Sequence, residues 1–360
     1  MPPPLSADKA LAAILPQISA GQAYEAHQKA RTFASRYSKA GAHDVAISVL
    51  YESATALFKA GQLGSGTDLS VLMLEMYENK EQEVDEASRA RLTQLISLVG
   101  GEGQWRKMIV DRAVAWSARH GSYPSGDPSL HGFIGALLAK EHDFVAAEPH
   151  LLASGTRESA KTLAQMLFAW SRDGAEPGTY ASKGVIPFLL TGNVLAARTF
   201  MSTFLSLLIT ARPNILATPS NAIAGSTANP IRFDVKGQSE RDEVYLTTEP
   251  TLNFLQLAIR TCQRAKSSSN LQQAKQAQEM WVRLCGSYQS RRGLVAQPVY
   301  REALGEIGTL FFDLPPPRMA GGGNPLQDMM ASFLGGSSGG GPGAKAKRTL
   351  PAPAEAIALD

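Results

Sequence analysis

The chain contains 360 residues, of which 44% are hydrophobic and 19% are charged, and its formal net charge is +3. This composition is ordinary for a globular protein and provides enough apolar material for a sizeable core. Lysine and arginine are scattered among aspartate and glutamate, and only the tail segment Lys345-Ala-Lys347-Arg348 is weakly basic. A nucleic-acid-binding protein normally carries a basic face or stripe, so we expect no nucleic acid partner.

The sequence gives no sign of a signal peptide or a membrane span. Residues Met1–Asp8 lack a basic segment followed by an apolar one. The most apolar run, Phe200–Ile209, is shorter than the roughly 18 residues that a span requires and contains Ser202 and Ser206. We therefore expect a cytosolic (cytoplasmic) protein without direct membrane insertion.

The first residues of the chain are proline-rich. A weak helical pattern over Ala10–Leu15 is expected to stop at Pro16, because proline breaks the hydrogen bonding of a helix interior. We expect residues 1–21 to be a flexible N-terminus, with order beginning near Gln22.

Two helices of nearly equal length follow. Apolar residues recur at helical spacing over Ala23–Ala40 and over His43–Ala60, and Gly41 and Gly61 stand where helix-ending glycines belong. A tight glycine turn between two such helices predicts an αα-hairpin. The second helix resembles the second helix of a tetratricopeptide unit, although the full repeat signature is missing.

The helical pattern continues to Asp313 with short loops between the helices. Further helices are predicted over Asp68–Tyr77, Glu86–Val99, Gln104–His120, Pro128–Lys140, Phe144–Ala153, Arg157–Arg172, Thr179–Leu190, Val194–Ala211, Pro250–Ala265, Leu271–Tyr288 and Val299–Phe312. We predict an all-α fold, an α-solenoid of tetratricopeptide-like helical hairpins, and such solenoids usually provide binding surfaces.

One segment interrupts the helices. After a polar loop at 213–229, residues Ile231–Val235 and Glu243–Thr247 alternate apolar and polar side chains around a polar turn. This pattern predicts an inserted β-hairpin at 231–248. An isolated two-stranded hairpin is marginally stable in water, so it must pack on something.

Residues 315–360 are rich in glycine and proline and are expected to be mostly disordered. They contain one apolar island, for which a short helix at 326–334 is predicted. This helix would either dock on the last helix pair or be offered to the groove of a partner.

Catalytic and metal-binding motifs are absent from the sequence. The six histidines are dispersed, and the tail lacks the Gly-Lys-Ser/Thr order of a phosphate-binding loop. Cys262 and Cys285 lie in helical patterns and are best interpreted as reduced, buried thiols. We therefore expect no enzymatic activity, no metal and no cofactor.

The polar face of the first predicted helix favours an interface. Tyr24, Gln28 and Arg31 recur at helical spacing opposite the alanine stripe, with His27 and Lys39 beside them. Most such faces are merely solvated, but tyrosine and arginine are enriched among interface anchors. Asp68 is expected at the start of its helix, where the helix dipole would stabilise a carboxylate.

Several short segments resemble one family in order and spacing. They are Tyr24-Glu-Ala-His-Gln28, Arg31-Thr32, Arg36-Tyr37, Gly64-Ser-Gly-Thr-Asp-Leu69, Gly126-Asp-Pro-Ser-Leu-His131, Asn253-Phe-Leu-Gln-Leu257, Thr261-Cys-Gln263, Leu326-Gln-Asp-Met-Met330 and Phe333-Leu-Gly-Gly336. The family is that of Golgi to ER traffic protein 4. The resemblance implies a non-enzymatic scaffold in the post-translational targeting of tail-anchored membrane proteins to the endoplasmic reticulum.

The resemblance also implies two partners. An arsenite-pump-like targeting ATPase would bind the N-terminal half, residues 22–190. This contact would regulate ATP hydrolysis by the ATPase and the handover of its client. A ubiquitin-like-domain protein of the Golgi to ER traffic protein 5 type would bind the C-terminal half, residues 191–314, where the hairpin would clasp it. The residues implied for the ATPase are Tyr24, His27, Arg31, Arg36, Lys39 and Asp68. Those implied for the second partner are Ile231, Phe233, Val235, Val244, Tyr245, Leu246 and Phe254.

Two positions depart from the family pattern. Lys39 stands where the family can carry an arginine, and Ala23 stands where it can carry a tyrosine, whose contact an alanine does not provide. The alternative is a generic tetratricopeptide-like adaptor that binds a peptide motif in its concave groove. Such an adaptor needs a row of Asn, Lys and Arg across successive first helices, and no such row is found.

Overall fold

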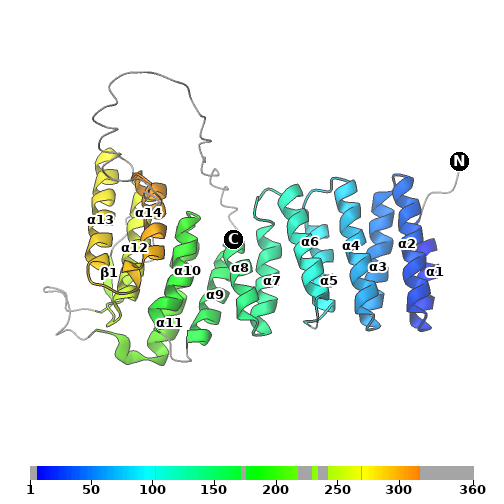
Figure 1. The fold of residues 1–360 in the computed structure, drawn as a ribbon, viewed down its shortest axis with the longest axis horizontal. Helices are drawn as coiled ribbons and strands as arrows, with labels where there is room; N and C mark the ends of the chain where they lie inside the picture. Colours follow the sequence, from blue (N-terminus) through cyan, green and yellow to red (C-terminus); the bar gives the residue numbers. More distant parts are fainter. Residues whose placement is uncertain are drawn as a thin grey trace, which may run out of the picture. The chain divides into compact units, whose positions relative to one another are not determined.

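The computed structural model describes residues 6–101, 103–171, 176–217, 229–233, 242–268 and 270–316. This part of the chain is a row of α-helices with one small sheet (Figure 1). The helices are α1 (Ala7–Ser19), α2 (Ala23–Lys39), α3 (His43–Lys59), α4 (Leu63–Asn79), α5 (Glu86–Leu98), α6 (Trp105–His120), α7 (Pro128–Lys140), α8 (Phe144–Ser154), α9 (Arg157–Trp170), α10 (Pro177–Leu190), α11 (Val194–Ala211), α12 (Pro250–Lys266), α13 (Leu271–Gln289) and α14 (Pro298–Phe312). The prediction of an all-α solenoid is confirmed.

The first helices alternate between two layers. Helices α1, α3, α5 and α7 contact one another in sequence, and so do α2, α4 and α6 on the other side. Residues on α2, α4 and α6 therefore share one face of the stack.

Glycine turns set the period of the first hairpins. Gly21, Gly41 and Gly61 adopt φ of +78°, +73° and +73°, a conformation that side-chain-bearing residues rarely adopt. Each turn lets the following amide reach back to the preceding helix, as Gln62 N does to Leu57 O at 2.9 Å. The predicted helix ends at Gly41 and Gly61 are confirmed.

The N-terminal segment is more ordered than expected. Helix α1 runs through Pro16 to Ser19, and its Ala10, Ile14 and Ile18 are buried against the following helices. Pro16 is exposed, so the carbonyl that it leaves without an amide partner can be solvated. The expectation of a flexible segment over 1–21 is therefore wrong for residues 7–19.

Helix α4 begins earlier than predicted. It starts at Leu63, so Gly64 and Gly66 lie inside the helix and Asp68 lies in its second turn. Gly66 is required by packing, because a Cβ there would meet the Phe58 ring at 2.6 Å. The interpretation of Asp68 as a residue stabilised at a helix N-terminus is therefore wrong.

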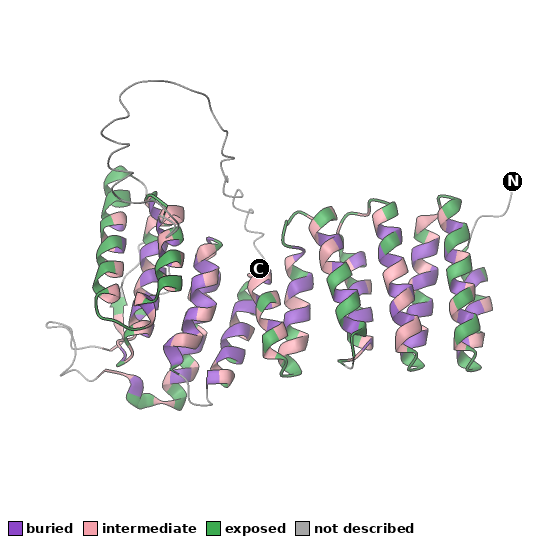
Figure 2. Ribbon diagram, in the orientation of Figure 1, coloured by how far each residue is buried: buried purple, intermediate pink, exposed green. Residues whose placement is uncertain are grey.

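The buried side chains form two hydrophobic cores, and Figure 2 shows the buried stripe on each helix. One core runs from α1 to α7, and the other begins with Ala147 on α8 and continues to α14. Leu138 packs against both. The cores thus divide at α7–α8, whereas the two halves were expected to meet near residue 190.

Helix α11 is long and apolar enough to cross a membrane. Its Phe200, Phe204 and Leu208 are buried in the second core, where the Phe200 and Phe204 rings stack with centroids 5.8 Å apart. The apolar composition of α11 is therefore explained by its place in the core.

The inserted hairpin is present. Strands β1 (Ile231–Phe233) and β2 (Asp242–Val244) are antiparallel, with Ile231 opposite Val244 and Phe233 opposite Asp242. Strand β2 ends at Val244, earlier than predicted, whereas the predicted strand residues after Phe233 lie outside the described residues. Val235, the turn at 236–241 and the predicted helix at 326–334 lie outside the described residues.

Candidate functional site

One candidate site is a polar cluster that joins α2 to α4. We call His27, Arg31 and Asp68 the N-terminal cluster. Oδ2 of Asp68 accepts hydrogen bonds from Arg31 Nη1 at 2.7 Å and from His27 Nε2 at 2.8 Å. The His27 side chain is 12% exposed, whereas those of Arg31 and Asp68 are 47% and 44% exposed. The cluster therefore combines a buried support with two charges that a partner can reach.

The geometry fixes the direction of the Asp68 carboxylate. Two donors hold Oδ2, while Oδ1 has no hydrogen bond to the described residues. Since a carboxylate can accept about four hydrogen bonds, Oδ1 remains available to a cationic group from outside. Arg31 likewise has five N–H donors and uses one of them on Asp68.

The other residues predicted for this surface lie around the cluster. Tyr24, one turn before His27, is 70% exposed. Tyr24 and Arg36 line a groove of about 550 Å³ along α1 and α2, together with Gln28 and Phe33. Lys39 is exposed at the last residue of α2. The structure thus brings His27, Arg31 and Asp68 together and leaves Lys39 at the helix end.

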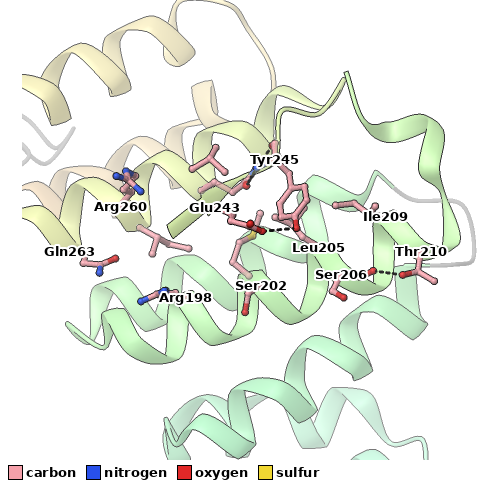
Figure 3. Close-up of a pocket in the computed structure, with 14 residues that line it drawn as sticks. Arg198, Ser202, Leu205, Ser206, Ile209, Thr210, Glu243, Tyr245, Arg260 and Gln263 are labelled. Carbon is pink, nitrogen blue, oxygen red and sulfur yellow. Dashed lines mark hydrogen bonds between the residues drawn. The ribbon is translucent and has the colours of Figure 1, made fainter. Parts of the chain in front are cut away.

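The second candidate site is a groove between α11 and α12, which we call the C-terminal groove (Figure 3). It encloses about 370 Å³ and is closed on one side by β2 and Tyr245. The apolar lining residues are Met201, Leu205, Ile209, Val244 and Ile259, and the polar ones are Arg198, Ser202, Ser206, Thr210, Glu243, Tyr245, Gln256, Arg260 and Gln263. This mixture of an apolar lining with a polar rim suits a protein segment better than a small hydrophilic ligand.

Glu243 and Tyr245 form the hairpin side of the groove. The Tyr245 hydroxyl donates to Glu243 Oε2 at 3.0 Å, and Arg232 Nε donates to Glu243 Oε1, also at 3.0 Å. These hydrogen bonds, from Arg232 first and then from Tyr245, lower the pKa of the Glu243 carboxyl. Burial and the adjacent Glu243 carboxylate raise the pKa of the Tyr245 hydroxyl. Glu243 therefore presents a stable negative charge beside the groove.

Three side-chain amides hold the chain after β2. Gln256 on α12 accepts from Tyr245 N and donates to Tyr245 O, both at 2.8 Å. Asn253 makes the same pair of bonds to the backbone of Thr247, at 2.9 and 2.8 Å. Each side-chain amide thus pairs with one backbone N–H and one backbone C=O, as a neighbouring β-strand would.

Asn229 completes this arrangement from the other side. Its Oδ1 accepts from Leu246 N at 3.1 Å and its Nδ2 donates to Leu246 O at 2.9 Å. We call Asn229, Asn253 and Gln256 the amide staples. This role of the three amides was not predicted from the sequence. The only signal was the spacing of Asn253 and Gln256, which places two amides on one face of α12.

The predicted partner-binding residues have different environments. Val244 and Tyr245 line the C-terminal groove, Ile231 pairs with Val244 in the sheet, and Leu246 is half-buried. Phe254 is 1% exposed, and its ring lies 5.3 Å from that of Tyr288. Its prediction as a partner contact is wrong, because it packs α12 onto the core. The side chain of Phe233 and all of Val235 lie outside the described residues.

The surroundings of the two cysteines favour the protonated thiol. Cys262 is buried, Cys285 is half-buried, and neither forms a disulfide. Burial raises the pKa of the Cys262 thiol and raises that of Cys285 to about 12. Because the thiolate is the nucleophile, neither group is prepared for covalent chemistry at neutral pH.

Stacked helical hairpins, with a polar cluster between α2 and α4 and a groove between α11 and α12, define a helical-repeat scaffold protein. The class can be made specific by comparison with known proteins. The family model described as Golgi to ER traffic protein 4 matches residues 40–334, and the chain belongs to this family. The family resemblance in the sequence is therefore confirmed.

Relatives in fungi and vertebrates carry the same description. Golgi to ER traffic protein 4 of Aspergillus fumigatus is 32% identical, with 98% of this chain and 99% of the relative aligned. The human homolog is 28% identical over 89% of this chain and 84% of its own length. A solved structure described as the crystal structure of C. therm. Get4 matches with a TM-score of 0.73 and 30% identity, covering 92% of this chain and 96% of that one.

Proposed function

We propose that this protein is a non-enzymatic cytosolic scaffold in the targeting of tail-anchored membrane proteins to the endoplasmic reticulum. It bridges an arsenite-pump-like targeting ATPase and a ubiquitin-like-domain protein, and it regulates ATP hydrolysis and client handover. Membership of the Golgi to ER traffic protein 4 family supports the pathway. The observation that carries the proposal is the N-terminal cluster, which presents one cation and one carboxylate oxygen from adjacent helices.

The N-terminal cluster supports binding to the ATPase in two ways. The exposed Arg31 guanidinium has donors left for an acidic group of the ATPase, and arginine is well suited to such planar contacts. The open Oδ1 of Asp68 can accept from a basic group of the ATPase. His27 and Arg31 already hold Oδ2, so the carboxylate is fixed and Oδ1 is pre-oriented. The Asp68 side chain therefore loses little conformational entropy on binding.

Regulation of hydrolysis follows from the Asp68 contact. A carboxylate placed against a basic group near the subunit interface of the ATPase would restrain that group while the nucleotide is bound. Arg31 is assigned mainly to affinity and Asp68 mainly to turnover. The assignment rests on the exposure of both groups and on the direction that the shared Oδ2 imposes.

The C-terminal groove supports the second partner. It is lined by two helices and by the hairpin, so an amphipathic segment can place apolar side chains against the half-buried Ile209 and Tyr245 and polar ones against the rim. Glu243 and Tyr245 stand at the hairpin side, where their polar groups can contact the segment. The amide staples hold the backbone on the hairpin side of the groove in place before the partner binds.

Calorimetry with the targeting ATPase dimer and a non-hydrolysable ATP analogue tests the proposal. Arg31→Glu should weaken binding at least about tenfold, corresponding to about 1.4 kcal/mol. Asp68→Lys should change ATPase turnover more than affinity. Lys161→Glu is the matched control, because Lys161 also forms an exposed ion pair, with Glu158 on α9. Wild-type affinity and turnover in both cluster variants would contradict the proposal.

A further inference from the structure

Trp105 lies against the same part of α4 that carries Asp68. It is the first residue of α6, and a Cβ added to Gly64 would lie 3.5 Å from its indole Cη2. Gly64 and Asp68 are one turn apart on one face of α4. The indole therefore stands next to the N-terminal cluster, on the side away from α2.

Trp105 contributes only part of its surface to the packing of α6. The helix buries Ile109, Ala113 and Trp116, whereas Trp105 is 39% exposed. Met108, which is 46% exposed, follows Trp105 by three residues and so lies on the same face. A tryptophan beside a flexible methionine at the surface is typical of binding sites, because both residues gain much by being covered.

The surface between α4 and α6 also carries carboxylates. Beyond Asp68, the exposed Glu75 lies two turns further along α4. Glu75 and Val71 line a groove of about 240 Å³ together with Arg112 of α6. Asp68 and Glu75 thus share one face of α4 with the half-buried Val71 between them, and a complementary partner would offer a basic side chain next to apolar ones.

We propose that Trp105 and Met108 extend the N-terminal cluster into one docking surface across α2, α4 and α6. Its occupant is a segment of the targeting ATPase in which a basic residue is flanked by apolar side chains. The basic residue meets Asp68, and the apolar side chains cover the indole and the thioether. This inference rests on the proposed function, because it concerns the same partner and the same carboxylate.

The covered indole contributes affinity that the charges alone do not. Exposed charge pairs add little because water competes for them, whereas a buried tryptophan is a frequent interface anchor. Once Trp105 is covered, water is also excluded from Asp68, which strengthens the contact of its carboxylate with the basic group. Trp105 is thus assigned to affinity and to the strength of the regulatory contact.

The test is calorimetry with the ATPase dimer and a non-hydrolysable ATP analogue, with the full chain throughout. Trp105→Ala should weaken binding roughly 30-fold, as removal of an interface anchor does, and Met108→Glu should weaken it at least about tenfold. Leu271→Ala is the matched control, because Leu271 is an exposed apolar residue at the first position of α13. It should leave the affinity unchanged.

The outcomes separate this inference from the proposed function. If Arg31→Glu loses the ATPase while Trp105→Ala and Met108→Glu retain wild-type affinity, the extended surface is wrong and the function stands. If the wild-type chain does not bind the ATPase, both are wrong. If Trp105→Ala lowers the melting temperature, the affinity of Met108→Glu for the ATPase alone tests the extended surface. The Met108→Glu variant leaves the contact between Trp105 and Gly64 intact.

Discussion

Arg31 of α2 and Asp68 of α4, 37 residues apart in the chain, are joined by a hydrogen bond of 2.7 Å between Nη1 and Oδ2. Both side chains are about half exposed, so the ion pair competes with water on each side. Such pairs contribute little to folding. The Arg31–Asp68 pair instead holds two opposite charges in a defined orientation on one surface.

This relationship predicts a weak effect on stability. Arg31→Ala, Asp68→Ala and the double variant should give a coupling free energy below about 1 kcal/mol, because the pair is exposed. Urea unfolding of the four proteins measures it. A coupling of several kcal/mol would mean that the pair is a structural element and that lost binding in its variants reflects lost folding.

A pair of histidines makes stability depend on pH. Nδ1 of His131 and Nδ1 of His150 are 2.9 Å apart, and His131 Nε2 lies 3.0 Å from the carbonyl oxygen of Ser125. Since a carbonyl oxygen only accepts, His131 carries its proton on Nε2, and His150 donates to it. Burial first, and then His131, lowers the pKa of His150 to about 4, and Asp111 opposes the shift.

The folded chain should therefore lose stability as the pH falls from 6.5 towards 4. A histidine whose folded pKa lies below its unfolded value stabilises fully above the unfolded pKa, because the unfolded chain takes up the proton first. The loss should be about 1–2 kcal/mol, since the ring is only partly buried and water screens part of the effect. Urea unfolding at several pH values measures it. His150→Gln should show a shallower dependence, and an equally steep one would refute the assignment.

Close helix packing makes Gly184 intolerant of a side chain. A Cβ at this position of α10 would lie 2.3 Å from Cζ of the buried Phe200 on α11. Gly184→Ala should destabilise the fold by about 1–3 kcal/mol, the usual range for overpacking. Gly286→Ala on α13 is the control, since nothing lies within 4 Å of the added Cβ. It should stabilise by about 0.5–1 kcal/mol through helix propensity, and thermal unfolding distinguishes the two.

We predict that the hairpin side of the C-terminal groove depends on Gln256, one of the amide staples. Gln256→Leu leaves the backbone N–H and C=O of Tyr245 without their partners and should cost about 1–3 kcal/mol. It should also weaken binding of the ubiquitin-like partner, because Tyr245 lines the C-terminal groove. Gln263→Leu, on the same helix and groove, is the control. Equal effects of the two variants on unfolding would exclude a special role for the staple.

Local patterns sufficed to predict most of the fold. Helical periodicity and the turns at Gly41 and Gly61 depend on neighbouring residues, and these predictions are confirmed. The segment before Gln22 was misjudged because periodicity does not reveal that Pro16 is on the solvent side of α1. The start of α4 was missed because Gly66 is explained by Phe58, a residue of another helix.

The candidate sites were predictable only in part. Tyr24 and Arg31 were predicted from the polar face of their helix and, together with Asp68, from a family resemblance. The contact of Arg31 with Asp68 depends on the stacking of α2 on α4. The packing of Trp105 on Gly64 and the amide staples join residues of different elements, and a single sequence carries no signal for either contact. Phe254 was misassigned because its alternating apolar neighbours do not indicate which side of α12 faces the core.

Sedimentation velocity of this chain mixed with both partners tests the central claim, that one scaffold holds two proteins at separate surfaces. With the wild-type chain and a non-hydrolysable ATP analogue, all three proteins should sediment as a single complex. Arg31→Glu should lose only the ATPase. Ser206→Arg, which fills the C-terminal groove from an exposed position of α11, should lose only the ubiquitin-like partner. Loss of both partners from either variant, with the fold intact, would contradict the claim.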